Sequence, residues 1–111
     1  MPRKTEYKFT EYLDKEKENI LFVKFVLSKD SEGPEEFVVS QIATIKGQMQ
    51  EIIRFDCSAK ERMNVHRFYT MPPEKQYLDM GINYETLELA KAGIRQNWHV
   101  YRMKYFETYN R

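Results

Sequence analysis

The chain has 111 residues, a length that suits one hydrophobic core and is too short for two, so we expect a single domain over residues 1–111. Lys and Arg number 18 against 17 Asp and Glu, and the resulting net charge of +1 excludes a protein that coats a polyanion by bulk charge. A single cysteine, Cys57, excludes an intrachain disulfide, and no apolar stretch approaches a membrane span, which together predict a soluble cytoplasmic protein without membrane contact.

Residues 1–18 are mostly polar, and their apolar side chains fit a helical turn or a short strand equally well, so both structures stay open for this segment. Residues 19–70 are predicted to form an antiparallel sheet. Four stretches rich in β-branched and aromatic residues lie in this range and are separated by turn residues. The expected strands, joined as a meander, are 20–27, 37–45, 49–57 and 64–70.

The third of these strands has two chemically different faces. Alternation along a strand places Gln50, Ile52, Arg54 and Asp56 on one face of the sheet. The opposite face is more apolar and carries Met49, Ile53 and Phe55. We therefore expect Arg54 and Asp56 to point to the same side of the sheet.

A long helix is predicted over residues 83–107. Residues 73–82 are expected to be irregular, and Asn83 can cap the helix with Glu85 in its first turn. Apolar side chains then recur every three or four residues and form one stripe, which consists of Leu87, Ala90, Ile94, Trp98, Tyr101 and Tyr105. Such a helix reaches roughly 36 Å, against about 23 Å for a seven-residue strand, so its end should extend past the sheet. The expected fold is thus α+β, a four-stranded antiparallel meander with one long C-terminal helix packed on one face.

Arg54, Asp56 and His66 form the first candidate catalytic site. If the third and fourth strands pair so that residue numbers sum to 120, Arg54 lies opposite His66 and Asp56 lies opposite Asn64, with all four side chains on one face. Arg54 can then bind a phosphate, while His66 acts as a general acid or base with its ring oriented by Asp56. This is the chemistry of metal-independent RNA cleavage. The alternative is an exposed ion pair between Arg54 and Asp56, with His66 as a bystander.

No metal site and no cofactor are expected. Structural zinc usually has four ligands that arrive as closely spaced pairs, and Cys57, His66 and His99 form no such pair. Cys57 ends a mostly apolar strand, which is typical of a small packed side chain rather than a nucleophile. The sequence contains no Walker, dinucleotide-binding, EF-hand or nucleophile-elbow pattern.

Positive charge gathers near the C-terminal end of the sequence. Residues 91–111 carry five basic side chains and one acidic one, whereas residues 1–90 have an acidic excess. The basic side chains alternate with aromatic ones, so they can contact phosphates and stack on bases, or dock onto an acidic partner protein. The expected binding residues are Arg67, Arg95, Trp98, Arg102 and Lys104. The alternative is purely structural, because cations are favoured near a helix C-terminus and the aromatic stripe must cover the sheet.

The strand at 20–27 provides the argument for association with another chain. Phe22 and Val26 lie on one of its faces, and Leu21 and Val23 lie on the other. Both faces therefore need cover, whereas one helix covers only one face of a sheet. The N-terminal segment or a second subunit must cover the rest.

The order of several short motifs resembles a known group of proteins. The run Ile52-Ile53-Arg54-Phe55-Asp56 is followed by His66-Arg67-Phe68 and then by a helix with Ile94, Asn97-Trp98 and Tyr101. This order, over residues 36–106, resembles small uncharacterised prokaryotic proteins and is similar to the TumE-type toxins of toxin–antitoxin pairs, which share the Arg-aromatic-Asp strand end followed by His. The His-rich loop of that group is reduced here to His66 alone. The resemblance implies a prokaryotic origin, a small partner protein, and Arg54, Asp56 and His66 as the site residues.

The leading hypothesis is a small intracellular interaction domain that acts through a protein partner or as a homodimer. The alternative is a toxin-like, metal-independent ribonuclease or RNA-binding protein that uses Arg54, Asp56, His66 and Arg67. The two hypotheses differ in the effect of His66→Ala, because this change abolishes a ribonuclease and leaves a docking surface almost unaltered.

Overall fold

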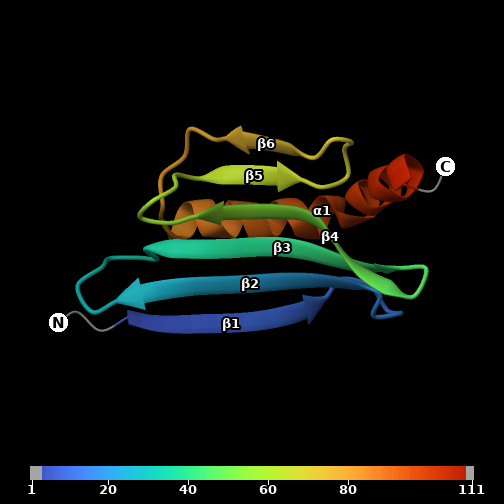
Figure 1. Ribbon diagram of the computed structural model, residues 1–111. Helices are drawn as coiled ribbons and strands as arrows, with labels where there is room; N and C mark the ends of the chain where they lie inside the picture. The colour runs from blue at the N-terminus through green and yellow to red at the C-terminus, as the bar shows by residue number, and fades with distance from the viewer. Residues whose placement is uncertain (1–3, 110–111) are drawn as a thin grey trace.

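The computed structural model describes residues 4–109, which form an antiparallel sheet of six strands and one long α-helix (Figure 1). The elements are β1 (Lys4–Tyr12), β2 (Asn19–Ser28), β3 (Glu36–Ile45), β4 (Gln48–Cys57), β5 (Asn64–Arg67), β6 (Glu74–Tyr77) and α1 (Tyr84–Tyr109). The strands neighbour each other in chain order, so the sheet is one continuous meander with β1 and β6 at its edges. The predicted α+β class and the C-terminal helix packed on an antiparallel sheet are confirmed.

The prediction of four strands was wrong, because the sheet has six. β1 lies in the N-terminal segment, for which the sequence allows helix or strand, and β6 lies within the stretch 73–82 that was expected to be irregular. Both are edge strands whose side chains are almost all exposed, so neither has the alternating apolar pattern of a half-buried strand. The fourth predicted strand is also shorter than expected, since β5 ends at Arg67 rather than at Thr70.

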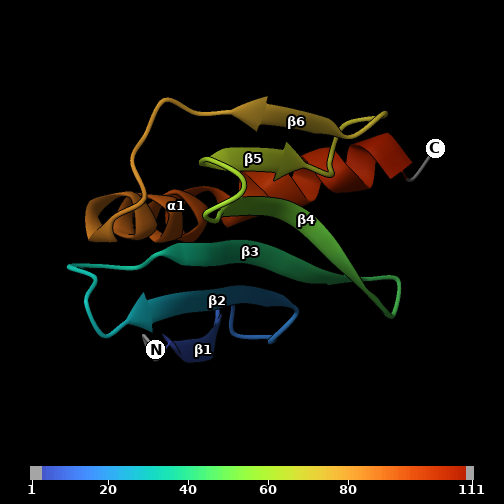
Figure 2. The same ribbon diagram turned by 60° about the vertical axis from the view of Figure 1, so that its left-hand side comes forward.

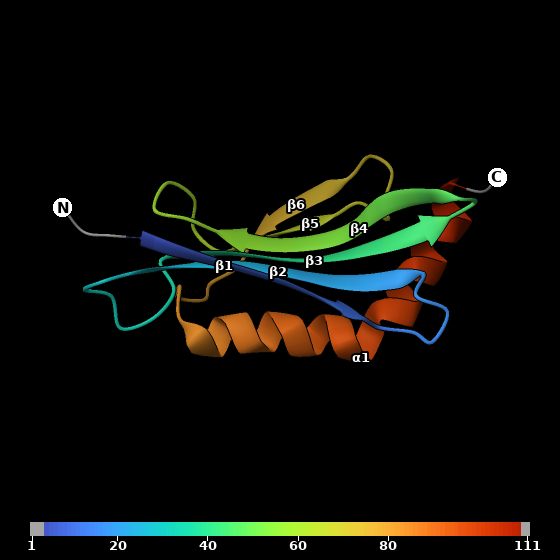
Figure 3. The same ribbon diagram turned by 90° about the horizontal axis from the view of Figure 1, so that it is seen from below.

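α1 lies on one face of the sheet, and no other described segment covers the opposite face (Figure 3). Because side chains alternate along a strand, the odd-numbered residues of β2 and β3 point toward α1 and the even-numbered residues point away from it. The almost fully buried core between the two layers includes Leu21, Val23, Phe37, Val39, Ile53, Val65, Leu87 and Ile94. We call the opposite side of the sheet the open face.

The apolar stripe predicted for the helix does face the sheet. Leu87, Ala90 and Ile94 are at most 5% exposed, and the aromatic members of the stripe pack against the same core. Asn83 caps the helix as predicted, because its Oδ1 accepts a hydrogen bond of 2.8 Å from the backbone N–H of Thr86. Within residues 4–109, no helix is both long and apolar enough to cross a membrane.

The end of α1 is attached to the chain that leaves β5. Thr108 Oγ1 donates a hydrogen bond of 2.8 Å to the carbonyl oxygen of Tyr69. The hydroxyl of Tyr109 donates one of 2.9 Å to the carbonyl oxygen of Thr70. The ring of Tyr101 stacks on that of Tyr69, with 5.6 Å between the ring centres. Figure 2 shows the last turns of α1 reaching the end of β5. The extra length expected of the helix therefore docks on this segment instead of standing free.

A bulge in β4 changes which side chains share a face. Gln41 of β3 pairs with Ile53, but the next residue, Ile42, pairs with Glu51, so Ile52 is left without a partner in β3. Ile52 and Ile53 are both buried in the core. The bulge therefore brings Glu51 to the open face, in the place where simple alternation predicts Ile52.

Candidate functional site

The residues predicted as a site on β4 and β5 come together on the open face. Arg54 pairs with His66 and Asp56 pairs with Asn64 across the two strands, so the expected register is confirmed. Paired residues of an antiparallel ladder point to the same side of the sheet. We use the name polar cluster for the side chains that meet here, which are Ser40, Glu51, Arg54, Asp56, Asn64 and His66.

Arg54 lies at the centre of the polar cluster and is held by two carboxylates. Its Nε donates a hydrogen bond of 2.9 Å to Asp56 Oδ2, and its Nη1 donates one of 3.0 Å to Glu51 Oε1. The guanidinium also lies over the ring of Phe68, 5.4 Å from the ring centre. Two of its five N–H groups are thus engaged by carboxylates, whose negative charge weakens the attraction of this cation for a phosphate.

Glu51 and Ser40 are the members of the polar cluster that sequence reasoning missed, and Glu51 is the one that contacts Arg54. Besides its bond to Arg54, it accepts a hydrogen bond of 2.7 Å from Ser40 Oγ. Strict alternation along the strand places Gln50 with Arg54, but the bulge turns Gln50 toward α1, where it accepts a hydrogen bond of 3.2 Å from the hydroxyl of Tyr105. A bulge has no distinct sequence signal in this strand, so the position of Glu51 requires the structure.

Asp56 is fixed from two sides. Asn64, which is fully buried, donates its side-chain N–H groups to Asp56 Oδ1 at 2.9 Å and to the backbone oxygen of the same residue at 3.1 Å. The other carboxylate oxygen, Oδ2, accepts from Arg54 and lies 3.4 Å from His66 Nε2. Asp56 therefore holds a defined orientation next to the imidazole.

The imidazole of His66 is oriented by its neighbours and partly shielded from solvent. Its side chain is 19% exposed, and its ring lies parallel to that of Phe68, with 5.8 Å between ring centres and 8° between planes. An imidazole beside a carboxylate can exchange a proton with a bound molecule if that molecule reaches the free ring nitrogen. The geometry thus allows general acid or base chemistry, but it offers no free cation within the polar cluster to hold an anionic substrate.

Three side chains near this point have donor atoms suited to a metal ion. Oxygens of Asp56 and Glu61 and a ring nitrogen of His66 all lie within 4.8 Å of one another. Each carboxylate already has a cation, because Glu61 forms an ion pair with Lys75 and Asp56 forms one with Arg54. The hydrogen bond to Glu61 also raises the pKa of Lys75, which keeps that ammonium charged. A metal would have to displace both cations, so the fit is poor.

The other metal candidates named from the sequence do not meet. Cys57 is buried at the end of β4, and burial raises the pKa of its thiol to about 11, so it is neither a thiolate ligand nor a nucleophile at neutral pH. His99 lies exposed on α1, whereas His66 lies on the open face, on the other side of the sheet. The structure therefore does not assemble these three side chains.

Arg67 does not belong to the polar cluster. Neighbouring residues of a strand point to opposite faces, so Arg67 lies on the side of α1 while His66 lies on the open face. Arg67 Nη1 donates a hydrogen bond of 2.8 Å to Gln76 Oε1 of β6. It therefore links the last two strands of the sheet.

The basic residues predicted for RNA or partner binding on α1 mostly hold the helix to the sheet. Arg95 forms two hydrogen bonds with Glu11 of β1, at 3.0 and 2.8 Å. Arg102 donates to Asn19 Oδ1 at 3.1 Å and lies 3.6 Å from a carboxylate oxygen of Glu18. The acidic partners lie more than eighty residues earlier in the chain, so composition alone does not reveal that these charges are paired.

Trp98 and Lys104, the two other residues predicted on α1, also contact the protein itself. Trp98 packs against the core, and its carbonyl oxygen accepts a hydrogen bond of 2.9 Å from Gln41 Nε2. The ammonium of Lys104 lies 5.3 Å from the ring centre of Tyr69. These contacts favour the structural alternative for the basic and aromatic side chains of α1.

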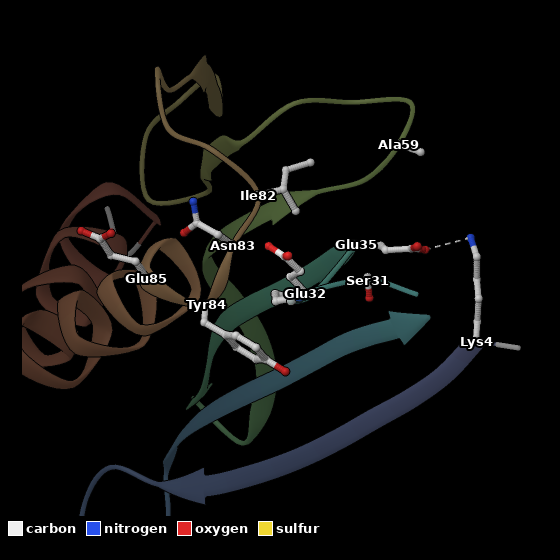
Figure 4. A pocket seen from close by; sticks show the side chains of 11 residues that line it. Lys4, Ser31, Glu32, Glu35, Ala59, Ile82, Asn83, Tyr84 and Glu85 are labelled. Atoms are coloured by element: carbon white, nitrogen blue, oxygen red, sulfur yellow. Dashed lines mark ion pairs between the residues drawn. The ribbon is translucent and has the colours of Figure 1, made fainter. Parts of the chain in front are cut away.

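A hollow of about 910 Å³ lies where α1 begins, away from the polar cluster (Figure 4). Its walls come from the β2–β3 loop, the start of β1 and the first turn of α1. Figure 4 shows Glu32 and Tyr84 within it and the ion pair of Lys4 and Glu35 at one rim, where the two charged atoms are 3.3 Å apart. None of the site residues predicted from the sequence lines this hollow.

Comparison with known proteins adds a family but no function. No curated protein and no solved structure matches the chain. One family model, described as a domain of unknown function, DUF7718, matches residues 1–111. Because this match spans the whole sequence, the chain belongs to the DUF7718 family.

Proposed function

We propose that the protein is a small interaction domain that binds a protein partner or a second copy of itself and needs neither a cofactor nor a catalytic step. The observation that carries this proposal is the open face, a broad sheet surface that no described segment covers. A sheet with only one face packed against a helix keeps its second face available for another chain.

The middle of the open face has the composition of a protein interface. The even-numbered residues of β2 and β3 place Ile20 opposite Ile42, Phe22 opposite Ser40, and Val38 beside Lys24. Its apolar members are half-buried in the isolated chain. Charged side chains surround them, including the polar cluster on β4 and β5. An apolar centre with a charged rim is typical of surfaces that bind other proteins.

Charge on the open face favours a protein over RNA. Glu6 lies 3.4 Å from Lys8 and 3.6 Å from Lys24, so positive and negative side chains alternate across the first two strands. Arg54 is likewise matched by two carboxylates. A surface with balanced charges lacks the net positive field that draws a nucleic acid. A partner with its own mixture of charges fits it better.

The second candidate is a toxin-like, metal-independent ribonuclease or RNA-binding protein, in line with the resemblance to prokaryotic TumE-type toxins. The confirmed register favours it, because it brings Arg54, Asp56 and His66 to one face. The pairing of Arg54 with two carboxylates disfavours the ribonuclease, because it reduces the positive charge available to an RNA phosphate. We place it second for this reason.

Incubation of the purified chain with mixed RNA separates the two candidates. We expect the wild type and His66→Ala to leave RNA equally intact, because Arg54, the cation next to the imidazole of the wild type, is already bound by two carboxylates. His99→Ala is the matched control, since His99 is exposed on α1. RNA cleavage by the wild type and by His99→Ala, lost in His66→Ala, would overturn the interaction proposal in favour of the ribonuclease.

A further inference from the structure

β1 is the longest free edge of the sheet. It has nine residues and pairs only with β2 among the described strands, so its other side presents unpaired backbone N–H and C=O groups. The edge at the other end of the sheet, β6, has only four residues. Figure 1 shows β1 at the lower edge of the sheet, beside β2. An exposed edge of this length is a template for pairing with another strand.

Two of the side chains of β1 that face α1 are aromatic and partly exposed. Tyr7 is 45% exposed and Phe9 is 38% exposed. Tyr7 stacks on Phe25 of β2, with 5.0 Å between ring centres, and Lys91 of α1 lies 5.6 Å from the ring centre of Phe9. These contacts fix the two rings at the edge but leave a side of each open to solvent.

The charges of β1 are complementary to themselves in two antiparallel registers, of which the one centred on Thr5 pairs only residues 4–6 of the strand and the one centred on Tyr7 pairs residues 4–10. A homodimer with two-fold symmetry places one residue opposite its own copy, and the neighbours on either side then pair symmetrically. If Tyr7 is at the centre, Glu6 of each copy lies opposite Lys8 of the other. Centring on Glu6 or on Lys8 places like charges opposite each other, and centring on Phe9 places Lys8 opposite Thr10.

We propose that β1 pairs antiparallel with β1 of a second copy, with Tyr7 opposite Tyr7. This inference rests on the proposed function and names the partner as the chain itself. It joins two sheets into one and places both α1 helices on the same side. The two Tyr7 rings then meet at the two-fold axis on the side of the helices, and Phe9 of each copy lies opposite Thr5 of the other, diagonal to the other Tyr7. On the open face, Glu6 and Lys8, which lie 3.4 Å apart within each chain, then form a cluster of four alternating charges across the two copies.

Charge reversal at the two complementary positions tests this register. Glu6→Lys gives a strand with lysine at both positions, and Lys8→Glu gives one with glutamate at both. Each single variant then has like charges opposite each other in its own homodimer, so we expect its dissociation constant to rise by at least about tenfold. The double variant Glu6→Lys/Lys8→Glu exchanges the charges and restores the wild-type constant. Sedimentation velocity across a range of concentrations measures the dissociation constant of the wild type and of each variant.

Mixing the two single variants provides the sharpest comparison. An equimolar mixture of Glu6→Lys and Lys8→Glu has opposite charges across the interface, so we expect the two variants to dimerise with each other more tightly than either does with itself. Lys15→Glu and Glu16→Lys make the same charge changes in the exposed β1–β2 turn and serve as controls that keep dimerisation. Circular dichroism of each variant during heating verifies that the fold is intact.

The outcomes distinguish this inference from the broader proposal. A wild-type dimer that the β1 variants leave unchanged contradicts the β1 contact but keeps an interaction domain that dimerises elsewhere. A wild type that stays monomeric at every concentration contradicts self-pairing through β1. A monomer that also degrades RNA, with the activity lost in His66→Ala, contradicts both.

Discussion

Arg54 shows how single contacts decide what the polar cluster can do. The guanidinium is held at 2.9 Å by Asp56 and at 3.0 Å by Glu51, and these two side chains leave little attraction for an outside anion. Glu51, Arg54 and Asp56 all lie on β4, and the bulge at Ile52 brings Glu51 to the same face as the other two. At the scale of the residue, the polar cluster therefore has the character of a structural network on the surface.

Removal of the cation from this network should reduce stability. We expect Arg54→Met to lower the free energy of unfolding by about 1 kcal/mol, because Glu51 and Asp56 then face each other without a positive partner. Methionine keeps part of the contact with Phe68. Urea titration at pH 7 measures the change, with Lys60→Met in the exposed β4–β5 loop as the control. Equal stability of the two variants would show that the network contributes nothing.

The ion pair of Glu11 and Arg95 predicts a pH dependence. The hydrogen bond from Arg95 lowers the pKa of Glu11 below its ordinary value of 4.5. A carboxyl group whose pKa is lowered by folding contributes stability above pH 4.5, and this contribution is lost as the pH falls through the folded-state pKa. We expect Glu11→Gln to cost less than about 1 kcal/mol at pH 7, because both side chains are largely exposed.

The difference between the wild type and Glu11→Gln should therefore shrink when the pH falls below 4.5. Unfolding by urea at a series of pH values from neutral to acidic measures it. Glu16→Gln, in the exposed β1–β2 turn, is the control for loss of one carboxylate. A difference that stays constant across the series would mean that the hydrogen bond with Arg95 does not stabilise the fold.

At the scale of the element, α1 holds the sheet through a narrow stripe. Ile94 is fully buried against the core, whereas Leu89 on the same helix is 53% exposed. A fully buried polar side chain, Gln41, adds a hydrogen bond of 2.9 Å to the carbonyl oxygen of Trp98. The helix is therefore positioned by apolar packing along its length and by polar contacts, which include this one near its middle and those of Arg95 and Arg102 with the first strands.

Truncation on the stripe should be far more costly than truncation beside it. We expect Ile94→Ala to lower the free energy of unfolding by about 3 kcal/mol, because it leaves a cavity under the helix. Leu89→Ala should change it by less than about 0.5 kcal/mol, since the side chain is exposed and alanine favours helix. Thermal and urea unfolding compare the two. Similar losses for both would contradict the packing described for α1.

Hydrophobic periodicity predicted those elements that bury apolar side chains on at least one of their faces. The strands β2 to β5 and the helix were predicted because burial requires apolar side chains at fixed intervals. β1 and β6 escaped this signal, because edge strands with exposed side chains are selected for backbone pairing rather than for burial. Periodicity therefore identifies the centre of this sheet and misses both of its edges.

The candidate site was predictable only as far as its register. The pairs Arg54–His66 and Asp56–Asn64 follow from hairpin geometry and were expected. Glu51 was not, because the bulge at Ile52 shifts the alternation by one residue without a glycine or proline to mark it. The partners of Arg95 and Arg102 lie at the other end of the sequence, so only the fold reveals that these cations are neutralised.

At the scale of the whole molecule, the sheet is packed on one side and free along one long edge. The positive charge of residues 91–111 is partly matched within the fold by Glu11 and Glu18, so it does not form a field for a polyanion. The open face and β1 are the surfaces that remain for a partner. Both are suited to contact with a protein, and β1 is suited to contact with itself.

The solution mass of the unmodified chain, measured by light scattering across a range of concentrations, tests the central claim most directly. We predict that the mass rises from that of one chain to that of two, and that mixed RNA added to the same sample stays intact. The mass of one chain at every concentration, together with RNA degraded by the wild type and spared by His66→Ala, would contradict the account.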